Sequence, residues 1–140
     1  MREILFRGKP IMSKTEWVEG FYNCIPCGRF LCADHCIQTI DYDGRIGLLY
    51  TVYENTVGQF TGLTDKNGKK IFEGDILKFH KFNGEPEWIG FVRYDISMFV
   101  IEGEQPVDRG GFEVQLCSID RKRCEIVGNI HDNQELMEDV

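Results

Sequence analysis

The sequence contains 140 residues, of which 42% are hydrophobic and 28% are charged, with a formal net charge of −7. The acidic balance argues against indiscriminate binding to nucleic acids, because affinity for phosphate depends on lysine and arginine. No apolar run reaches the roughly 20 residues of a membrane-spanning helix, and the charged N-terminal stretch does not resemble a signal peptide. We therefore expect a cytoplasmic protein with no membrane partner, whose six cysteines are thiols or metal ligands rather than disulfides.

Short alternating segments predict β-strands in the first part of the chain. The candidates are residues 3–7, 16–22, 29–33 and 47–54. Gly20 interrupts the second candidate, which predicts a bulge or a close approach of another backbone at that position. Asp43-Gly44 is a turn signal that separates the last two candidates.

The second half continues the pattern of strands and turns. Asn67-Gly68 is the strongest hairpin signal, because both residues tolerate a positive φ. Apolar residues follow it in three groups: Ile76, Leu77, Phe79 and Phe82, then Trp88, Gly90, Val92 and Tyr94, then Phe112, Val114 and Leu116. The first group predicts a strand partly buried on both faces, and the other two predict strands with one apolar face. Residues 125–132 close the sheet region, and residues 133–139 predict a short helix with Asn133 as its N-cap.

The predicted fold class is mainly β, with short antiparallel strands, a small SH3-like barrel in the second half and a short C-terminal helix. The barrel is expected from the strand–turn–strand spacing over residues 70–130. We expect a single domain of residues 1–140, divisible into an N-terminal β lobe of residues 1–55 and a barrel-like lobe of residues 56–132. Such barrels bind many unrelated ligands, so this fold by itself predicts no function.

The stretch GLTDKNGKK resembles a phosphate-binding loop, but its spacing is wrong. Five residues separate Gly62 from Gly68 where the P-loop has four, and Lys69 is not followed by serine or threonine. A calcium loop fails as well, since its bidentate glutamate would fall on Gly74. The preferred interpretation is a hairpin turn stabilised by the side chain of Asp65.

Glu73, Asp75 and His80 are the only residues that suggest acid–base chemistry. Two carboxylates on one strand face can divide the roles of acid and base when their pKa values are split. No further polar residue that would split them is evident, so we expect two solvated acids and a histidine at the surface or at a sheet edge. We therefore predict no catalytic residue, no cofactor-binding residue and no enzymatic activity.

Four cysteines lie close together in CIPCGRFLCADHC: Cys24, Cys27, Cys32 and Cys36. Their C-x2-C-x4-C-x3-C spacing is close to that of a zinc knuckle, with His35 as a spare ligand. However, the cluster has a single C-x2-C pair, Phe30 and Leu31 favour a strand, and buried free cysteines often act as small hydrophobic residues. We favour a hairpin that turns at residues 26–28 and predict no metal ligand. A small zinc-binding adaptor is kept as an alternative.

A nucleic-acid-binding module is a second alternative. It would use a local strip of lysines with two aromatic residues for stacking: Lys66, Lys69, Lys70, Lys78 and Lys81, with Phe79 and Phe82. The acidic total of the chain opposes this interpretation, so nucleic acid is not the expected partner.

The stretch TVGQFTGLTDKNGKKIFEGDILKF, residues 56–79, closely resembles the central pattern of the YopX family. MREILFRGK at the start and WVEGFY at residues 17–22 are similar to the N-terminal pattern of that family, and EIVGNIHDNQEL at residues 125–136 is similar to its closing pattern. The blocks occur in the same order, while residues 23–55 and 80–124 match weakly. Glu54-Asn55-Thr56 departs from the Asp-Pro-Glu that often opens the central block, and the cysteine cluster lies outside the family pattern.

The resemblance implies a cytoplasmic, β-rich protein of phage or prophage origin in a bacterial host, with no established activity, cofactor or catalytic residue to transfer. Because the sequence shows no catalytic group either, the leading hypothesis is a non-enzymatic accessory protein of unknown biochemical activity. It would act by binding a host or phage protein, or by self-assembly as a homo-oligomer.

Overall fold

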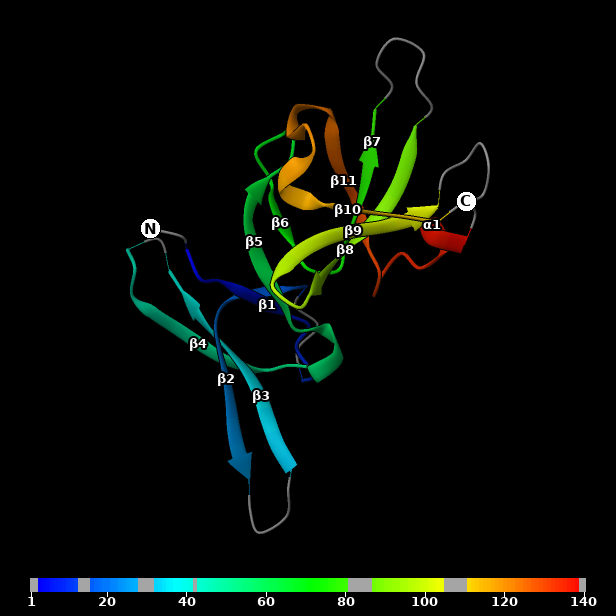
Figure 1. Cartoon of the computed structure of the whole chain (residues 1–140). Helices are drawn as coiled ribbons and strands as arrows, with labels where there is room; N and C mark the ends of the chain where they lie inside the picture. Colours follow the sequence, from blue (N-terminus) through cyan, green and yellow to red (C-terminus); the bar gives the residue numbers. More distant parts are fainter. Residues whose placement is uncertain are drawn as a thin grey trace. The chain divides into compact units, whose positions relative to one another are not determined.

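The computed structural model describes residues 3–12, 16–27, 32–41, 43–80, 87–104 and 111–138. The chain divides into two compact units, Met1–Phe60 and Thr61–Val140. The division falls inside strand β5 (Gly58–Thr64), a few residues after the boundary expected between Asn55 and Thr56 (Figure 1). Each unit is described below by itself.

The first unit is built from antiparallel strands. They are β1 (Phe6–Gly8), β2 (Val18–Cys27), β3 (Cys32–Ile40), β4 (Ile46–Thr51) and the start of β5, with the 3-10 turn η1 (Glu54–Thr56) before β5. Backbone hydrogen bonds arrange them in the order β4-β3-β2-β1-β5. Strands β2 and β3 form a long hairpin, and β4 occupies the edge of this order (Figure 1).

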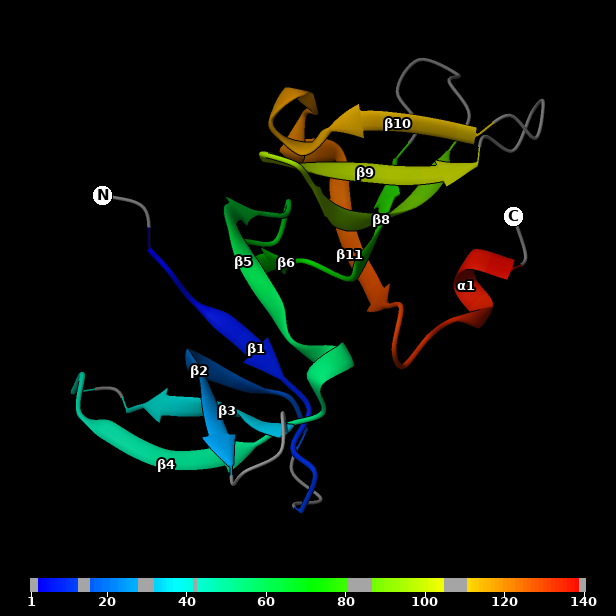
Figure 2. The same ribbon diagram turned by 60° about the horizontal axis from the view of Figure 1, so that its bottom comes forward.

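The second unit contains the end of β5, its hydrogen-bonded neighbour β6 (Lys70–Phe72) and a separate antiparallel sheet. The strands of that sheet are β7 (Asp75–Phe79), β8 (Trp88–Asp95), β9 (Met98–Glu104), β10 (Gly111–Gln115) and β11 (Cys124–Asn129). The 3-10 turns η2 (Leu116–Ser118) and η3 (Arg121–Arg123) connect β10 to β11, and the short helix α1 (Glu135–Glu138) follows β11. Figure 2 shows α1 beside the end of β9 and the start of β10.

The sheet of the second unit is open. Its strand order is β10-β9-β8-β7-β11, and in the described residues the two end strands do not pair with each other. The expectation of a mainly β, antiparallel fold with a short C-terminal helix is confirmed, whereas the SH3-like barrel is not. Local spacing predicts strands and hairpins, but closure depends on strand tilt and stagger, which are set by pairings distant in sequence.

The prediction that the side chain of Asn133 caps the N-terminus of the C-terminal helix is wrong. The side-chain oxygen of Asn133 accepts the backbone N–H of Asn129 at 3.2 Å. Asn133 therefore closes the turn after β11 with its side chain. This bond is possible because residues 129–133 fold back on themselves before the helix begins.

Gly20 confirms the close backbone approach expected from the sequence. A Cβ atom at this position of β2 would overlap the carbonyl oxygen of Gln38 on the neighbouring strand β3. Glycine permits this approach because it has no side chain, and the pairing of Gly20 with Thr39 depends on it.

In the described residues, the two units share a turn pattern in which an aspartate side chain accepts two backbone N–H groups. Asp41 Oδ1 accepts the backbone N–H groups of Asp43 and Arg45, and Asp65 Oδ1 accepts those of Asn67 and Lys69. Each turn carries a glycine at its fourth position, with φ of +76° at Gly44 and +78° at Gly68. The Asx-stabilised turn expected at Asp65 is confirmed.

The second unit holds the larger described core. Its buried residues are Ile71, Leu77, Phe79, Val92, Phe99, Ile101, Leu116 and Cys124. In the first unit, Val18, Ile37 and Val52 form a smaller cluster, with Phe6, Tyr22, Tyr50 and Val57 packed against it. Alternation of apolar residues along the strands directs these side chains to one face of each sheet.

Candidate functional site

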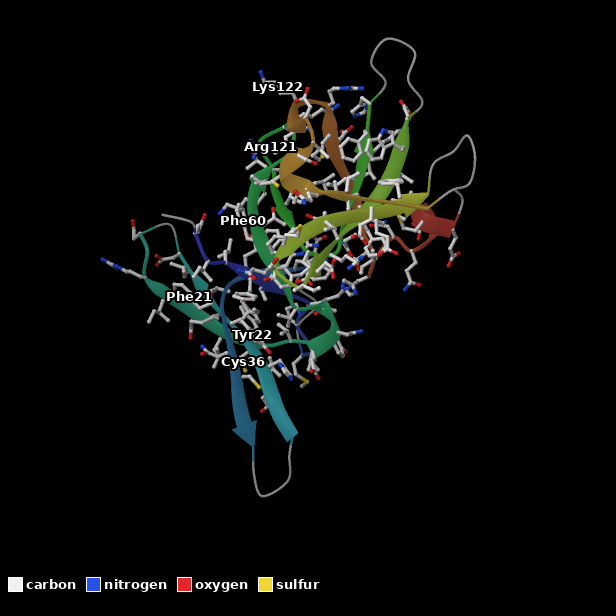
Figure 3. The ribbon with its side chains drawn as sticks, in the orientation of Figure 1. Phe21, Tyr22, Cys36, Phe60, Arg121 and Lys122 are labelled. Atoms are coloured by element: carbon white, nitrogen blue, oxygen red, sulfur yellow. The ribbon has the colours of Figure 1, made fainter. Side chains whose placement is uncertain are left out.

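The cysteine-rich segment forms a hairpin, as the sequence favoured, but the turn expected at residues 26–28 is wrong, because Pro26 and Cys27 still belong to β2 and pair with Ala33 and Cys32. The strand register pairs Cys24 with His35 and Cys27 with Cys32. Because His35 and Cys36 are consecutive in a strand, Cys36 lies on the opposite sheet face from Cys24. Cys24 is exposed and Cys36 is buried, and both are free thiols (Figure 3). The side chains of Cys27 and Cys32 lie outside the described part of the structure.

This geometry does not fit a zinc knuckle. A knuckle needs four ligands directed at one tetrahedral centre, whereas Cys24 and Cys36 face away from each other across the sheet. Among the side chains that the structure describes, no group of three histidine, cysteine or acidic residues could hold a metal ion.

A polar array that the sequence did not suggest lies on the Cys24 side of the hairpin. The hydroxyl of Tyr22 is hydrogen-bonded to His35 Nδ1, and His35 Nε2 lies 3.5 Å from the Glu54 carboxylate. Burial raises the pKa of Tyr22, and the nearby Cys24 and Glu54 raise it further. The phenol therefore stays protonated, which suits a hydrogen-bond donor and not a nucleophile. No sequence signal marked this array, because it depends on the β2–β3 register.

The residues considered for acid–base chemistry do not form one site. Asp75 begins β7 and His80 follows its last residue, so they are about 16 Å apart at the usual rise per strand residue. Asp75 is 2% exposed, and its Oδ2 accepts the backbone N–H of Phe72 at 2.8 Å. The expectation of a solvated Asp75 is therefore wrong, because this carboxylate folds inward to close the turn before β7.

His80 belongs to a half-exposed ionic cluster. Its Nε2 lies 2.9 Å from Glu125 Oε2 and 3.0 Å from Lys66 Nζ, and Lys66 lies 3.3 Å from the same carboxylate. Hydrogen bonds from Lys66 and then His80 lower the pKa of Glu125. This arrangement links the turn after β5 to β7 and β11, and its groups already contact one another.

Within the described residues, the lysine strip offers no exposed aromatic side chain for stacking on bases. Phe79 is buried and stacks on Trp88, with ring centroids 4.4 Å apart. Lys78 lies 3.3 Å from the Glu87 carboxylate. Lys81 and Phe82 lie outside the described residues. A second basic element, which the sequence did not suggest, is η3. Its Arg121 and Lys122 are labelled in Figure 3.

An exposed apolar surface lies on the outer part of the first sheet. We define the apolar face as Phe21, Ile40, Ile46 and Leu49. The register places Phe21, Gln38 and Leu49 in one row across β2, β3 and β4, and it pairs Ile40 with Ile46 in the next row of the same face. Phe21 and Leu49 are each 51% exposed, and Ile46 is 76% exposed. Four large exposed apolar side chains thus share one face of the sheet, on the edge strand β4 and the two strands next to it. Figure 3 marks Phe21, the member on β2.

These observations define an antiparallel β protein whose candidate catalytic residues Asp75 and His80 are separated and which exposes an apolar sheet face. A family model described as YopX protein matches residues 31–138. The chain therefore belongs to the YopX family, as its sequence blocks suggested.

One solved structure is similar to the chain over nearly its whole length. It is the crystal structure of protein EF1440 from Enterococcus faecalis, at 22% sequence identity and a TM-score of 0.51, covering 98% of this chain and 99% of that chain. At this identity the likeness concerns the fold alone. A sequence search among curated proteins finds no match. The described residues include no helix with the length and apolar character needed to cross a membrane.

Proposed function

We propose that this YopX protein is a non-enzymatic accessory protein that acts by protein binding, and that the apolar face is its contact surface. The observation that carries the proposal is the exposure of Phe21, Ile46 and Leu49 in adjoining rows of one sheet face. Contiguous exposed apolar patches on soluble proteins commonly mark interaction sites. The phage or prophage origin and cytoplasmic location implied by the family resemblance are part of this proposal.

The edge position of β4 supports a second copy of this chain as the partner. In the described residues, β3 is the sheet neighbour of β4, while the C-terminal end of β4 is held by the Pro10–Val52 bridge and by the Ile11 N–H bonded to the Thr51 carbonyl. The part centred on Leu49 therefore presents an open edge. Two copies related by a two-fold axis, with their apolar faces packed against each other, would bury these side chains and cover the open edges.

A nucleic-acid function is not part of the proposal. The stacking residue Phe79 is in the core, and Lys66 and Lys78 already contact carboxylates. A catalytic function is left out because Asp75 and His80 lie at opposite ends of β7.

The test is the oligomeric state of the full chain by sedimentation velocity over a range of concentrations. We expect the wild-type protein to self-associate and Leu49→Lys to shift the equilibrium to the monomer. Each dimer loses two buried leucines at about 2 kcal/mol each, and the total of about 4 kcal/mol corresponds to a dissociation constant roughly a thousandfold weaker.

Ile96→Lys is the matched control, because Ile96 is 93% exposed but belongs to the β8–β9 turn of the second unit. It should leave the association unchanged. A monomeric wild-type protein at every concentration would reject self-assembly, and equal effects of both substitutions would reject the apolar face as the contact surface.

A further inference from the structure

A groove in the second unit combines an apolar wall with an excess of carboxylates. One part, of about 450 Å³, is lined by Phe91, Glu102, Gly103, Gly111, Phe112, Glu113 and Met137. An adjoining part, of about 490 Å³, shares Phe91 and Met137 and continues along the segment before and within α1. The lining residues therefore place the groove between α1 and the β8–β9–β10 sheet.

The strand register explains why carboxylates gather there. Phe91 pairs with Glu102, and Glu102 pairs with Glu113, so the three side chains form one row across β8, β9 and β10. Two glutamates directly opposite each other on neighbouring strands repel. A row of this kind destabilises the sheet unless a cation compensates for it.

Arg93 provides part of that compensation. Its Nε donates to Glu102 Oε2 at 2.5 Å, its Nη2 donates to Glu113 Oε2, and its Nη1 lies 3.6 Å from Asp95. One guanidinium thus contacts three carboxylates. With three negative charges and one positive charge, the cluster retains a net charge of −2. Glu102 and Glu113 keep about half of their side-chain surface in solvent, so they remain accessible to a further cation.

The apolar side chains of the groove indicate that the ligand also has apolar parts. Phe91 and Met137 line the same groove as the two glutamates, whereas the Phe112 ring packs on Trp88 at the opposite face of the sheet. A lysine or arginine side chain has an aliphatic stem that packs on apolar surface and a charged end that seeks a carboxylate. An aromatic ring beside the stem adds a cation–π attraction. A peptide that alternates apolar and basic residues would satisfy both parts of the groove.

We propose that the groove formed by Phe91, Glu102, Glu113 and Met137 is a docking site for an extended basic peptide segment of a partner protein. An apolar side chain of the peptide lies against Phe91 and Met137, and an arginine or lysine side chain contacts Glu102 and Glu113. The inference deepens the proposed protein-binding function by naming a partner class, but it uses a surface separate in sequence from the apolar face. The two can therefore fail independently.

The experiment is an amide chemical-shift titration of the ¹⁵N-labelled full chain with a heptapeptide of alternating leucine and arginine. A second peptide with glutamine in place of arginine has similar apolar content without the charge. We expect the arginine peptide to shift the signals of Phe91, Gly103, Gly111 and Met137. The glutamine peptide should bind about tenfold more weakly, since it lacks the charge-assisted contacts.

Two variants test whether the peptides bind in the groove. The double variant Glu102→Gln plus Glu113→Gln should weaken the arginine peptide about tenfold while leaving the glutamine peptide unchanged. Met137→Gln should weaken both peptides severalfold, because it removes an apolar wall and no charge. Met137 is partly exposed in the four-residue helix α1, so the fold does not depend on it.

The double variant Glu16→Gln plus Glu19→Gln is the matched control, because it removes the same two charges from exposed positions of the first unit. Three results would overturn the proposal: equal weakening by both double variants, equal affinity for the two peptides, or no binding. Shifts confined to Ile40, Ile46 and Leu49 would also overturn it and would leave the proposed role of the apolar face intact.

Discussion

At the scale of single residues, the carboxylate of Asp65 joins the turn after β5 to strand β11 in the second unit. Its Oδ1 accepts the N–H groups of Asn67 and Lys69 within the turn, and its Oδ2 accepts that of Ile126 in β11 at 3.1 Å. Burial by itself would raise the pKa of Asp65, but the three N–H donors outweigh it, and the pKa is lowered overall. The ionised form is thus the one that the fold stabilises.

We expect Asp65→Ala to lower the free energy of unfolding by about 3 kcal/mol, because it leaves N–H groups without their charged acceptor. Asp41→Ala is the matched control, since Asp41 makes the same two turn hydrogen bonds but is exposed. It should cost less than about 1 kcal/mol, as water replaces the lost acceptor. Urea unfolding monitored by circular dichroism measures both. Equal losses would show that the bond to Ile126 contributes nothing.

The lowered pKa of Asp65 also predicts a dependence on pH. A carboxylate with a depressed pKa in the folded state stabilises the protein above its unfolded value of about 3.9, and this stability is lost as the pH falls through the folded pKa. Stability should therefore decrease on acidification below about pH 4. Asp65→Asn should reduce this pH dependence. An unchanged acid transition in Asp65→Asn would contradict the assignment.

At the scale of elements, the β2–β3 hairpin depends on the absence of a side chain at one position. Gly20→Ala would place a Cβ atom against the Gln38 carbonyl oxygen, which belongs to backbone and cannot rotate away. We expect a loss of roughly 2–4 kcal/mol in the free energy of unfolding, together with faster amide exchange in β2 and β3.

Gly111→Ala is the control for this substitution. Gly111 also lies in a strand, but the nearest atom to an added Cβ is the Gly103 carbonyl oxygen at 3.9 Å. The change should be neutral or slightly stabilising, because alanine loses less conformational entropy on folding. If both variants behaved alike, the tight contact at Gly20 would have no energetic role.

At the scale of the whole molecule, the reactivity of two buried thiols measures the unfolding of each unit separately. Cys36 is buried in the first unit, and Cys124 is buried in the second. Burial, together with the negative charges of Asp65 and Asp75, raises the pKa of Cys124 to about 12. Neither thiol should react until its unit opens, whereas the exposed Cys24 and Cys117 should react in the native protein.

We expect Cys36 to become reactive at a lower urea concentration than Cys124, because the described core of the first unit is smaller. Alkylation followed by peptide mass spectrometry measures both thiols in a chain with the other four cysteines changed to serine. Simultaneous exposure would mean that the two units unfold as one cooperative body. Reaction of Cys124 in the native protein would contradict its burial.

The features that the sequence by itself determined are those with local causes. Alternating apolar residues placed most of the strands, Asn67-Gly68 and Asp65 specified their turn, and Gly20 indicated a close backbone contact. These signals depend on residues within a few positions of each other, or on the absence of a side chain. The resemblance to the YopX family could also be identified from the sequence, because the matching blocks lie in these strands and turns.

The tertiary structure alone decided which distant residues meet. In the folded chain, the sheet expected to be a barrel is open, and the carboxylate of Asp75 is buried. Tyr22 is hydrogen-bonded to His35, and Phe91, Glu102 and Glu113 lie in one row. Each of these outcomes depends on strand register, and a shift by one residue would move every side chain of a strand to the other face. Register is set by pairing and bulges over the whole sheet, which is why local patterns predicted the strands but not the surfaces they form.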